Sequence, residues 1–213
     1  MKDYWFNQHI NRGFHPGSMV VTDKFFYVPI PKNSSSYITA LLRANDWQLY
    51  NFLYDNITDK KCIILLRDPV ERWITGISQY LCSYVLADDF NSSNLINDWS
   101  RLAERIIFDQ VIFDDHTEQQ CYFFNSIPID KCVFFDSTNQ PEVNIKKYMN
   151  TLDYDLDINI ELPKNESIGN RDHNRLCKFF TLWLQENPGL MQRIKDVYRD
   201  DYNLIETVNF YGY

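Results

Sequence analysis

The chain has 213 residues, of which 45% are apolar and 23% are charged. This length and balance predict a single domain over residues 1–213 with a sizeable core, and they argue against disorder. The net charge of −8 argues against nucleic acid or an anionic membrane as a partner, but a small anionic ligand held by local cations remains compatible with it.

No targeting or membrane-spanning segment is evident. The start of the chain lacks the apolar region of a signal peptide, and no apolar run reaches the ~18 residues that cross a bilayer. The five cysteines include no Cys-x-x-Cys pair, which favours reduced thiols and disfavours a zinc site. We therefore expect a soluble, cytoplasmic protein without a membrane span.

The predicted elements alternate along the chain. Apolar runs predict buried strands at 19–21, 25–30, 62–66 and 132–135. Periodic apolar positions predict helices at 36–44, 69–85, 95–110, 143–152, 174–185 and 189–202. The second strand, the first helix and the third strand form a βαβ unit, which implies an α/β fold with a parallel sheet and a right-handed crossover.

The stretch FFYVPIPKNSSS joins a predicted strand to a predicted helix. It places a lysine, an asparagine and three serines at the helix N-terminus, namely Lys32, Asn33, Ser34, Ser35 and Ser36. Unpaired N–H groups and the helix dipole make such a terminus an anion site, where a lysine acts as a point charge on a phosphate. The alternative interpretation is a serine-rich turn that caps the helix, with a surface lysine beside it. The pattern GxxxxGK[ST] is absent, which disfavours an ordinary ATP or GTP loop.

A second cation follows the next buried strand. Arg67 comes directly after residues 62–66, and Thr75 follows eight positions later in a helix that Asp68 and Pro69 should start. Ligands of open α/β sheets bind beyond the carboxyl ends of strands, so Lys32 and Arg67 should share one edge if their strands are parallel neighbours. Two cations with several hydroxyls suit a ligand that carries two separated phosphates.

The segments PKNSSSYI and LLRDPVERWITGISQY resemble the two cofactor-binding motifs of sulfotransferases that use 3′-phosphoadenosine-5′-phosphosulfate (PAPS). The segment DDHTEQQC is similar to the His-x-x-x-Gln segment of the carbohydrate and membrane-associated branch, and VYRDDYNLI is similar to the closing Tyr-x-x-Asp-Tyr helix of that branch. The resemblance covers roughly residues 25–205. It implies an α/β, P-loop-like three-layer fold in which helices flank a central, mainly parallel sheet.

The resemblance also implies roles for individual residues. Lys32 matches the lysine that stabilises the leaving phosphate, and Ser34–Ser36 stand where the family binds the 5′-phosphate, although the family has glycines there. Arg67 matches the 3′-phosphate arginine, and Thr75 stands where serine is usual. Arg171, in the segment NESIGNR, could add a contact to the 3′-phosphate. The implied reaction transfers a sulfuryl group from PAPS to a hydroxyl or amine of a carbohydrate or small-molecule acceptor, with no metal required.

Such a transfer needs a base to take the acceptor proton. His116 is the best candidate, because unperturbed histidine titrates near ~6.5, and the neighbouring Asp114 and Asp115 could orient it or raise its pKa. Glu118 is the second candidate base. Glu71 and Arg72 are expected on the surface of their helix.

Two other functions stay open. An ATP-dependent phosphotransferase would want a Gly-Lys-Ser/Thr loop and a strand-end aspartate for magnesium, and neither is evident in the sequence. A non-catalytic nucleotide-binding member of the same fold is favoured by the missing loop glycines. Retention of Lys32, Arg67 and Thr75 together argues against that alternative.

Overall fold

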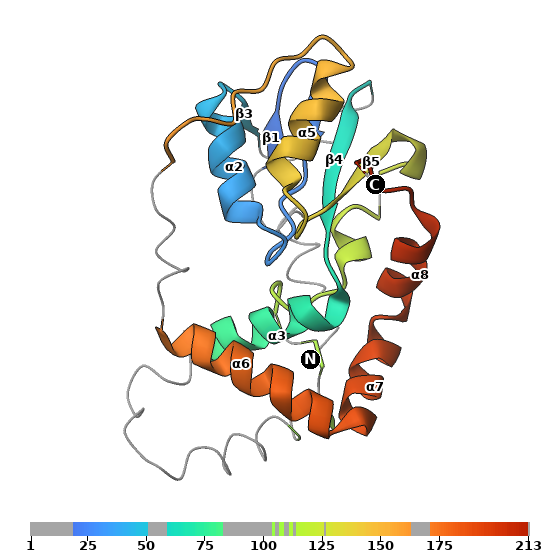
Figure 1. Ribbon diagram of the computed structural model, residues 1–213. Coiled ribbons are helices and arrows are strands. Elements are labelled where there is room, and N and C mark those ends of the chain that lie inside the picture. Colours follow the sequence, from blue (N-terminus) through green and yellow to red (C-terminus); the bar gives the residue numbers. More distant parts are fainter. Residues whose placement is uncertain are drawn as a thin grey trace. The chain divides into compact units, whose positions relative to one another are not determined.

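The computed structural model describes residues 19–50, 59–82, 104, 107–108, 111–112, 114–125, 127–162 and 171–212. They belong to two compact units. Unit 1 comprises Met1–Arg67, Gln120–Asn165 and Leu204–Tyr213, and unit 2 comprises Asp68–Gln119 and Glu166–Asn203. Figure 1 draws the elements of both units. The single domain expected from the sequence stays a prediction, and most of the helix expected at 95–110 lies outside the described residues.

Unit 1 is built on a five-stranded sheet with the order β3-β1-β2-β4-β5. The strands are β1 (Met19–Val21), β2 (Phe25–Tyr27), β3 (Gln48–Tyr50), β4 (Lys61–Leu66) and β5 (Cys132–Asp136). The pairs β2–β4 and β4–β5 are parallel, whereas β1 is antiparallel to both β2 and β3. The fold is therefore mixed α/β, as expected, but the sheet is mixed instead of mainly parallel.

The reason for the antiparallel pair lies in the connection between β1 and β2. Only three residues separate these strands, and a parallel pairing needs a crossover of a dozen or more. The Thr22 N–H donates to the carbonyl of Phe25 at 2.8 Å, and the Phe25 N–H donates to the Thr22 hydroxyl at 3.0 Å. These two bonds close a tight turn, so β1 and β2 form a hairpin.

Helices cover one face of this sheet, and the other face is covered by apolar loop residues together with Leu204 and Ile205 at the end of α8 (Arg199–Thr207). Alternate strand residues, among them Phe25, Ile63 and Leu65, pack against α2 (Ser35–Ala44) and α5 (Pro141–Asn150). Figure 1 shows these two helices on the same side of the strands. The intervening strand residues face Phe123, Phe124 and Ile127, a segment that begins with the 3₁₀ turn Gln120–Phe123. This alternation is the period-2 pattern of a sheet buried on both faces.

Unit 2 is helical. Its core joins α3 (Pro69–Tyr80), α6 (Arg171–Glu186) and α7 (Pro188–Val197), with the Trp73 and Phe180 rings edge to face at 5.9 Å between centroids. The helix α3 starts as predicted, because an Asp68 carboxylate oxygen accepts from the Glu71 N–H at 2.9 Å and Pro69 follows the cap.

The single helix expected at 189–202 is instead two helices. The first, α7, ends at Val197, and α8 (Arg199–Thr207) begins after Tyr198. Among the residues described here, no helix is long and apolar enough to cross a membrane.

Candidate anion site and histidine cluster

The carboxyl end of β4 is the meeting point of the two predicted cationic segments. Because β2 and β4 are parallel neighbours, the segments that follow them emerge at the same edge of the sheet. Arg67 directly follows β4, and its Nη1 donates to the backbone carbonyl of Lys32 at 3.3 Å. Both residues are half-buried. The structure thus brings Lys32 and Arg67 together within unit 1.

The loop that carries Lys32 has an unusual backbone. Lys32 has φ 68° and Ser34 has φ 58°, so two residues with side chains occupy the left-handed region that favours glycine. Each such residue costs about 1 kcal/mol, and strained backbone of this kind is concentrated at functional sites. At these two positions the loop therefore has the positive φ angles that glycine would adopt without strain.

Asn33, between these two strained residues, anchors the loop. Its side chain is fully buried, and its Nδ2 donates to the carbonyl of Leu65 at 2.8 Å and to Oε1 of Gln120 at 2.6 Å. Its Oδ1 is buried without a hydrogen-bond partner among the described residues. Asn33 thus serves the loop from inside the protein, and its amide nitrogen is not turned toward a ligand.

The N-terminus of α2 is open, in contrast to that of α3. Ser34 stands at the cap position but makes no side-chain cap bond; its hydroxyl donates instead to the carbonyl of Ser137 at 3.2 Å. The N–H of Ile38 makes the bond to the Ser34 carbonyl, so the N–H groups of the residues between them lie in the unpaired first turn. That turn contains no acidic side chain. This geometry argues against the capping-turn interpretation and suits an anion at the helix terminus.

Three further predicted site residues, Thr75, His116 and Arg171, belong to unit 2. Thr75 is half-buried in α3, and its hydroxyl donates within the helix to the carbonyl of Arg72 at 2.8 Å. Arg171 is the first residue of α6, but its side chain lies outside the described residues. Ser35 and Ser36, in the first turn of α2, are half-buried and exposed, respectively.

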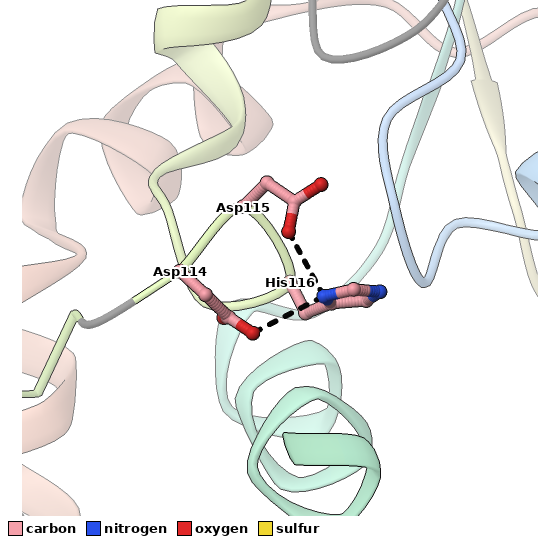
Figure 2. A group of neighbouring side chains, drawn as sticks. All are labelled: Asp114, Asp115 and His116. Carbon is pink, nitrogen blue, oxygen red and sulfur yellow. Dashed lines mark hydrogen bonds and ion pairs between the residues drawn. The ribbon is translucent and has the colours of Figure 1, made fainter. Parts of the chain in front are cut away.

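His116 sits between two carboxylates. Its Nδ1 lies 3.2 Å from Oδ2 of Asp114 and 2.9 Å from Oδ1 of Asp115, and Figure 2 shows both carboxylates approaching that one nitrogen. Burial alone would lower the pKa of His116, but the hydrogen bonds to Asp114 and Asp115 outweigh it and raise the pKa to about 9. The imidazole is therefore protonated at neutral pH, and its Nε2 faces away from the carboxylates.

The donor atoms of these three side chains lie within 4.8 Å of one another, a spacing that could also hold a metal ion. A metal would have to displace the proton from Nδ1, because only a neutral imidazole is a ligand. The two ion pairs account for the arrangement of the cluster without a metal.

Arg72 and Gly76 hold the loop that carries this cluster. Arg72 is only 1% exposed, and its guanidinium donates to the carbonyls of Asp115, at 3.0 Å, and Glu118. A Cβ at Gly76 would clash with the backbone carbonyl of His116, lying 3.0 Å from its carbon. The expectation that Arg72 lies on the helix surface is wrong. Its guanidinium is buried because it provides hydrogen-bond donors for these loop carbonyls.

The second candidate base is poorly suited to that role. Glu118 is 2% exposed, and its Oε1 accepts from the N–H of Gln119 at 2.8 Å. A base must reach the proton that it abstracts, and this carboxylate faces the protein interior. His116 is thus the better placed of the two.

Sequence patterns gave little indication of two further residues at the β4 end. Gln120 is fully buried and bonds both Asn33 and Arg67, and the buried Ser137 provides the carbonyl that accepts from Ser34. Gln120 was visible only as the last member of the His-x-x-x-Gln pattern.

Comparisons of the chain with protein-family models, with curated proteins and with solved structures found no match in any of the three.

Proposed function

We propose that the protein is a PAPS-dependent sulfotransferase, which transfers a sulfuryl group to a hydroxyl or amine of a carbohydrate or small-molecule acceptor. One observation carries the proposal: Lys32 and Arg67 meet at the ends of neighbouring parallel strands, beside the uncapped N-terminus of α2. An anion with two phosphates needs such a combination of two cations and unpaired N–H groups. The motif resemblance supplies the identity of that anion.

In the proposed reaction, the acceptor oxygen attacks the sulfur of PAPS and the bond from sulfur to the 5′-phosphate oxygen breaks. Lys32 and the N–H groups of Ser35 and Ser36 stabilise the charge that develops on the leaving phosphate. The motif resemblance assigns the 3′-phosphate to Arg67, with Thr75 and Arg171 as further contacts. The acceptor proton goes to a base, and adenosine 3′,5′-bisphosphate leaves.

We further propose that unit 1 is a variant of the P-loop-like three-layer fold. The support is the order β2, loop, α2, with β4 as the parallel neighbour of β2, α2 and α5 over one sheet face and the end of α8 against the other. The parallel centre of the sheet would then be β2, β4 and β5, and β1 and β3 would be additional strands beside β2. A cytoplasmic location stays a prediction.

His116 is the proposed base, with a specific consequence for pH. A group with a pKa of about 9 is deprotonated in only about 1% of molecules at pH 7. Its Nε2 can accept a proton only after the imidazolium has lost one, so catalysis through His116 should strengthen toward alkaline pH.

The same observation favours a second candidate, a non-catalytic member that binds the nucleotide and lacks a working base near neutral pH. An ATP-dependent phosphotransferase has less support: β5 ends at Asp136, an aspartate that could hold magnesium, but the loop after β2 has no Gly-Lys-Ser/Thr pattern.

Calorimetric titration tests the proposal. Wild-type protein should bind adenosine 3′,5′-bisphosphate without magnesium and bind ATP at least about tenfold more weakly, since ATP lacks the 3′-phosphate. Arg67→Ala should abolish this preference, whereas Arg43→Ala, a matched change in the last turn of α2, should leave it intact. Equal binding of ATP and the bisphosphate, or no binding of either, would contradict the proposal. Release of the bisphosphate from PAPS with an acceptor would distinguish the enzyme from the non-catalytic binder.

A further inference from the structure

The side chain of Gln120 bonds both segments of the candidate anion site. Its Oε1 accepts from Nδ2 of Asn33 at 2.6 Å and from the backbone N–H of Arg67 at 3.0 Å. Its Nε2 donates to the backbone carbonyl of Arg67 at 2.9 Å. Gln120 is fully buried, so water cannot replace these partners.

The two bonds to Arg67 reproduce those of a neighbouring strand. A carboxamide offers one acceptor and one donor side by side, as a peptide group does, and Gln120 uses both on the N–H and C=O of a single residue. The ladder of β4 and β5 reaches Leu66, whose carbonyl accepts from the Ser137 N–H at 2.9 Å. Gln120 thus fixes the backbone of the first residue beyond the strand, and with it the direction of the Arg67 side chain.

The third bond fixes the lysine loop. Asn33 divides its two N–H groups between Gln120 and the carbonyl of Leu65, and it lies between the positive-φ residues Lys32 and Ser34. A strained loop keeps its shape only where the surrounding structure holds it. Gln120 and the carbonyl of Leu65, near the end of β4, provide that support.

We propose that Gln120 is a positioning residue that couples the Lys32 loop to Arg67, so that a ligand with two phosphates meets both cations in a preset geometry. The nature of the ligand rests on the proposed function; the coupling itself does not. Preorganisation of this kind raises affinity by lowering the ordering cost of binding, and the gain is largest for a ligand that uses both cations at once. A purely structural glutamine would affect all ligands alike.

The test compares Gln120→Met, which keeps the side-chain length but loses the amide, with Gln119→Met. Gln119 is a matched control, because it is a buried neighbour whose amide donates to the carbonyl of Val197 and not to Arg67. Gln120→Met should weaken binding of adenosine 3′,5′-bisphosphate by about tenfold and that of adenosine 5′-monophosphate by no more than about twofold. Gln119→Met should change neither affinity. An equal loss for both ligands in Gln120→Met would overturn the inference.

A second readout needs no nucleotide. Hydrogen exchange of the Arg67 amide should become faster in Gln120→Met, while that of Ile64 within β4 stays protected. Unchanged exchange at Arg67 would overturn the inference whatever the wild-type protein binds. If the wild-type protein binds no bisphosphate, the proposed function fails, and the hydrogen-exchange comparison alone decides the coupling.

Gln120→Glu provides a conservative rescue. A protonated carboxylic acid has the donor and the acceptor of the amide, whereas the carboxylate has lost the donor and repels the Arg67 carbonyl. Relative to wild type at each pH, binding to this variant should recover between about pH 8 and about pH 5. A deficit that does not change over this range would overturn the assignment of the Nε2 bond.

Discussion

The guanidinium of Arg67 donates to the backbone carbonyl of Lys32 across 35 positions of sequence. This bond ties the segments that follow β2 and β4, so Lys32 and Arg67 are held at one edge of the sheet. Two cationic residues anchored at one edge suit an anionic ligand.

The strained loop predicts an unusual order of stability at position 34. Ser34→Gly should be more stable than Ser34→Ala by about 1 kcal/mol, because both variants lose the bond to the Ser137 carbonyl but only glycine adopts φ 58° without strain. Urea denaturation measures the difference. The same pair at Ser36, which lies within α2, should show the reverse order, since alanine favours helix. Equal stability of the two Ser34 variants would contradict the strain.

Gly76 predicts a second matched pair. Gly76→Ala should lower the free energy of unfolding by about 2 kcal/mol, because the added methyl meets the carbonyl of His116, which is backbone and cannot rotate away. Gly189→Ala should raise it by up to about 1 kcal/mol, since nothing lies within 4 Å of the new Cβ and alanine favours helix. Thermal unfolding of both variants checks the contrast. A neutral Gly76→Ala would show that the His116 loop does not lie against α3.

His116 predicts a dependence of stability on pH. Its pKa rises from 6.5 to about 9 on folding, so its ion pairs stabilise the protein fully below pH 6.5, and this contribution is lost as the pH rises toward 9. The melting temperature of His116→Gln should therefore fall furthest below that of wild type at acidic pH, and the two should converge above pH 9. A gap that widens with rising pH would contradict the assigned protonation.

The carboxylates provide the control for this prediction. Asp115→Asn removes one of the two ion pairs and should lower the pKa of His116, which NMR titration of the imidazole would show directly. Sulfuryl transfer, if His116 is the base, should follow the same shift, with its alkaline rise moving to lower pH. An unchanged pH profile would assign the base elsewhere.

The sequence predicted those parts of the fold that local patterns determine. The strands β1, β4 and β5 are marked by apolar runs, and α3 by its Asp68-Pro69 start. The edge strand β3 was missed, because its three residues, Gln48–Tyr50, form no apolar run. Leu49, in the middle of the strand, is 45% exposed, so the strand is not marked by burial either. The sheet is mixed because the turn between β1 and β2 is too short for a parallel pairing. The length of that turn was visible in the sequence, but the pairing of β1 with β3 depends on the whole sheet.

In the candidate site too, some features could be predicted from local sequence and others depend on contacts between distant residues. The placement of Lys32 and Arg67 at one edge followed from a general rule about parallel strands. The burial of Arg72 did not, because a charged residue on a helix is usually exposed, and its partners are carbonyls 43 and 46 positions away. The positive φ of Lys32 and Ser34 was equally hidden, since it depends on the contacts of Asn33 with Leu65 and Gln120, far along the chain.

The most direct test of the account is ³¹P NMR of adenosine 3′,5′-bisphosphate, which reports on its two phosphates separately. Titration with wild-type protein should shift both resonances. Lys32→Ala should remove mainly the shift of the 5′-phosphate, and Arg67→Ala mainly that of the 3′-phosphate. Resonances that do not move with wild-type protein, or that respond identically to both variants, would contradict the claim that the two cations at the strand ends form one site for two phosphates.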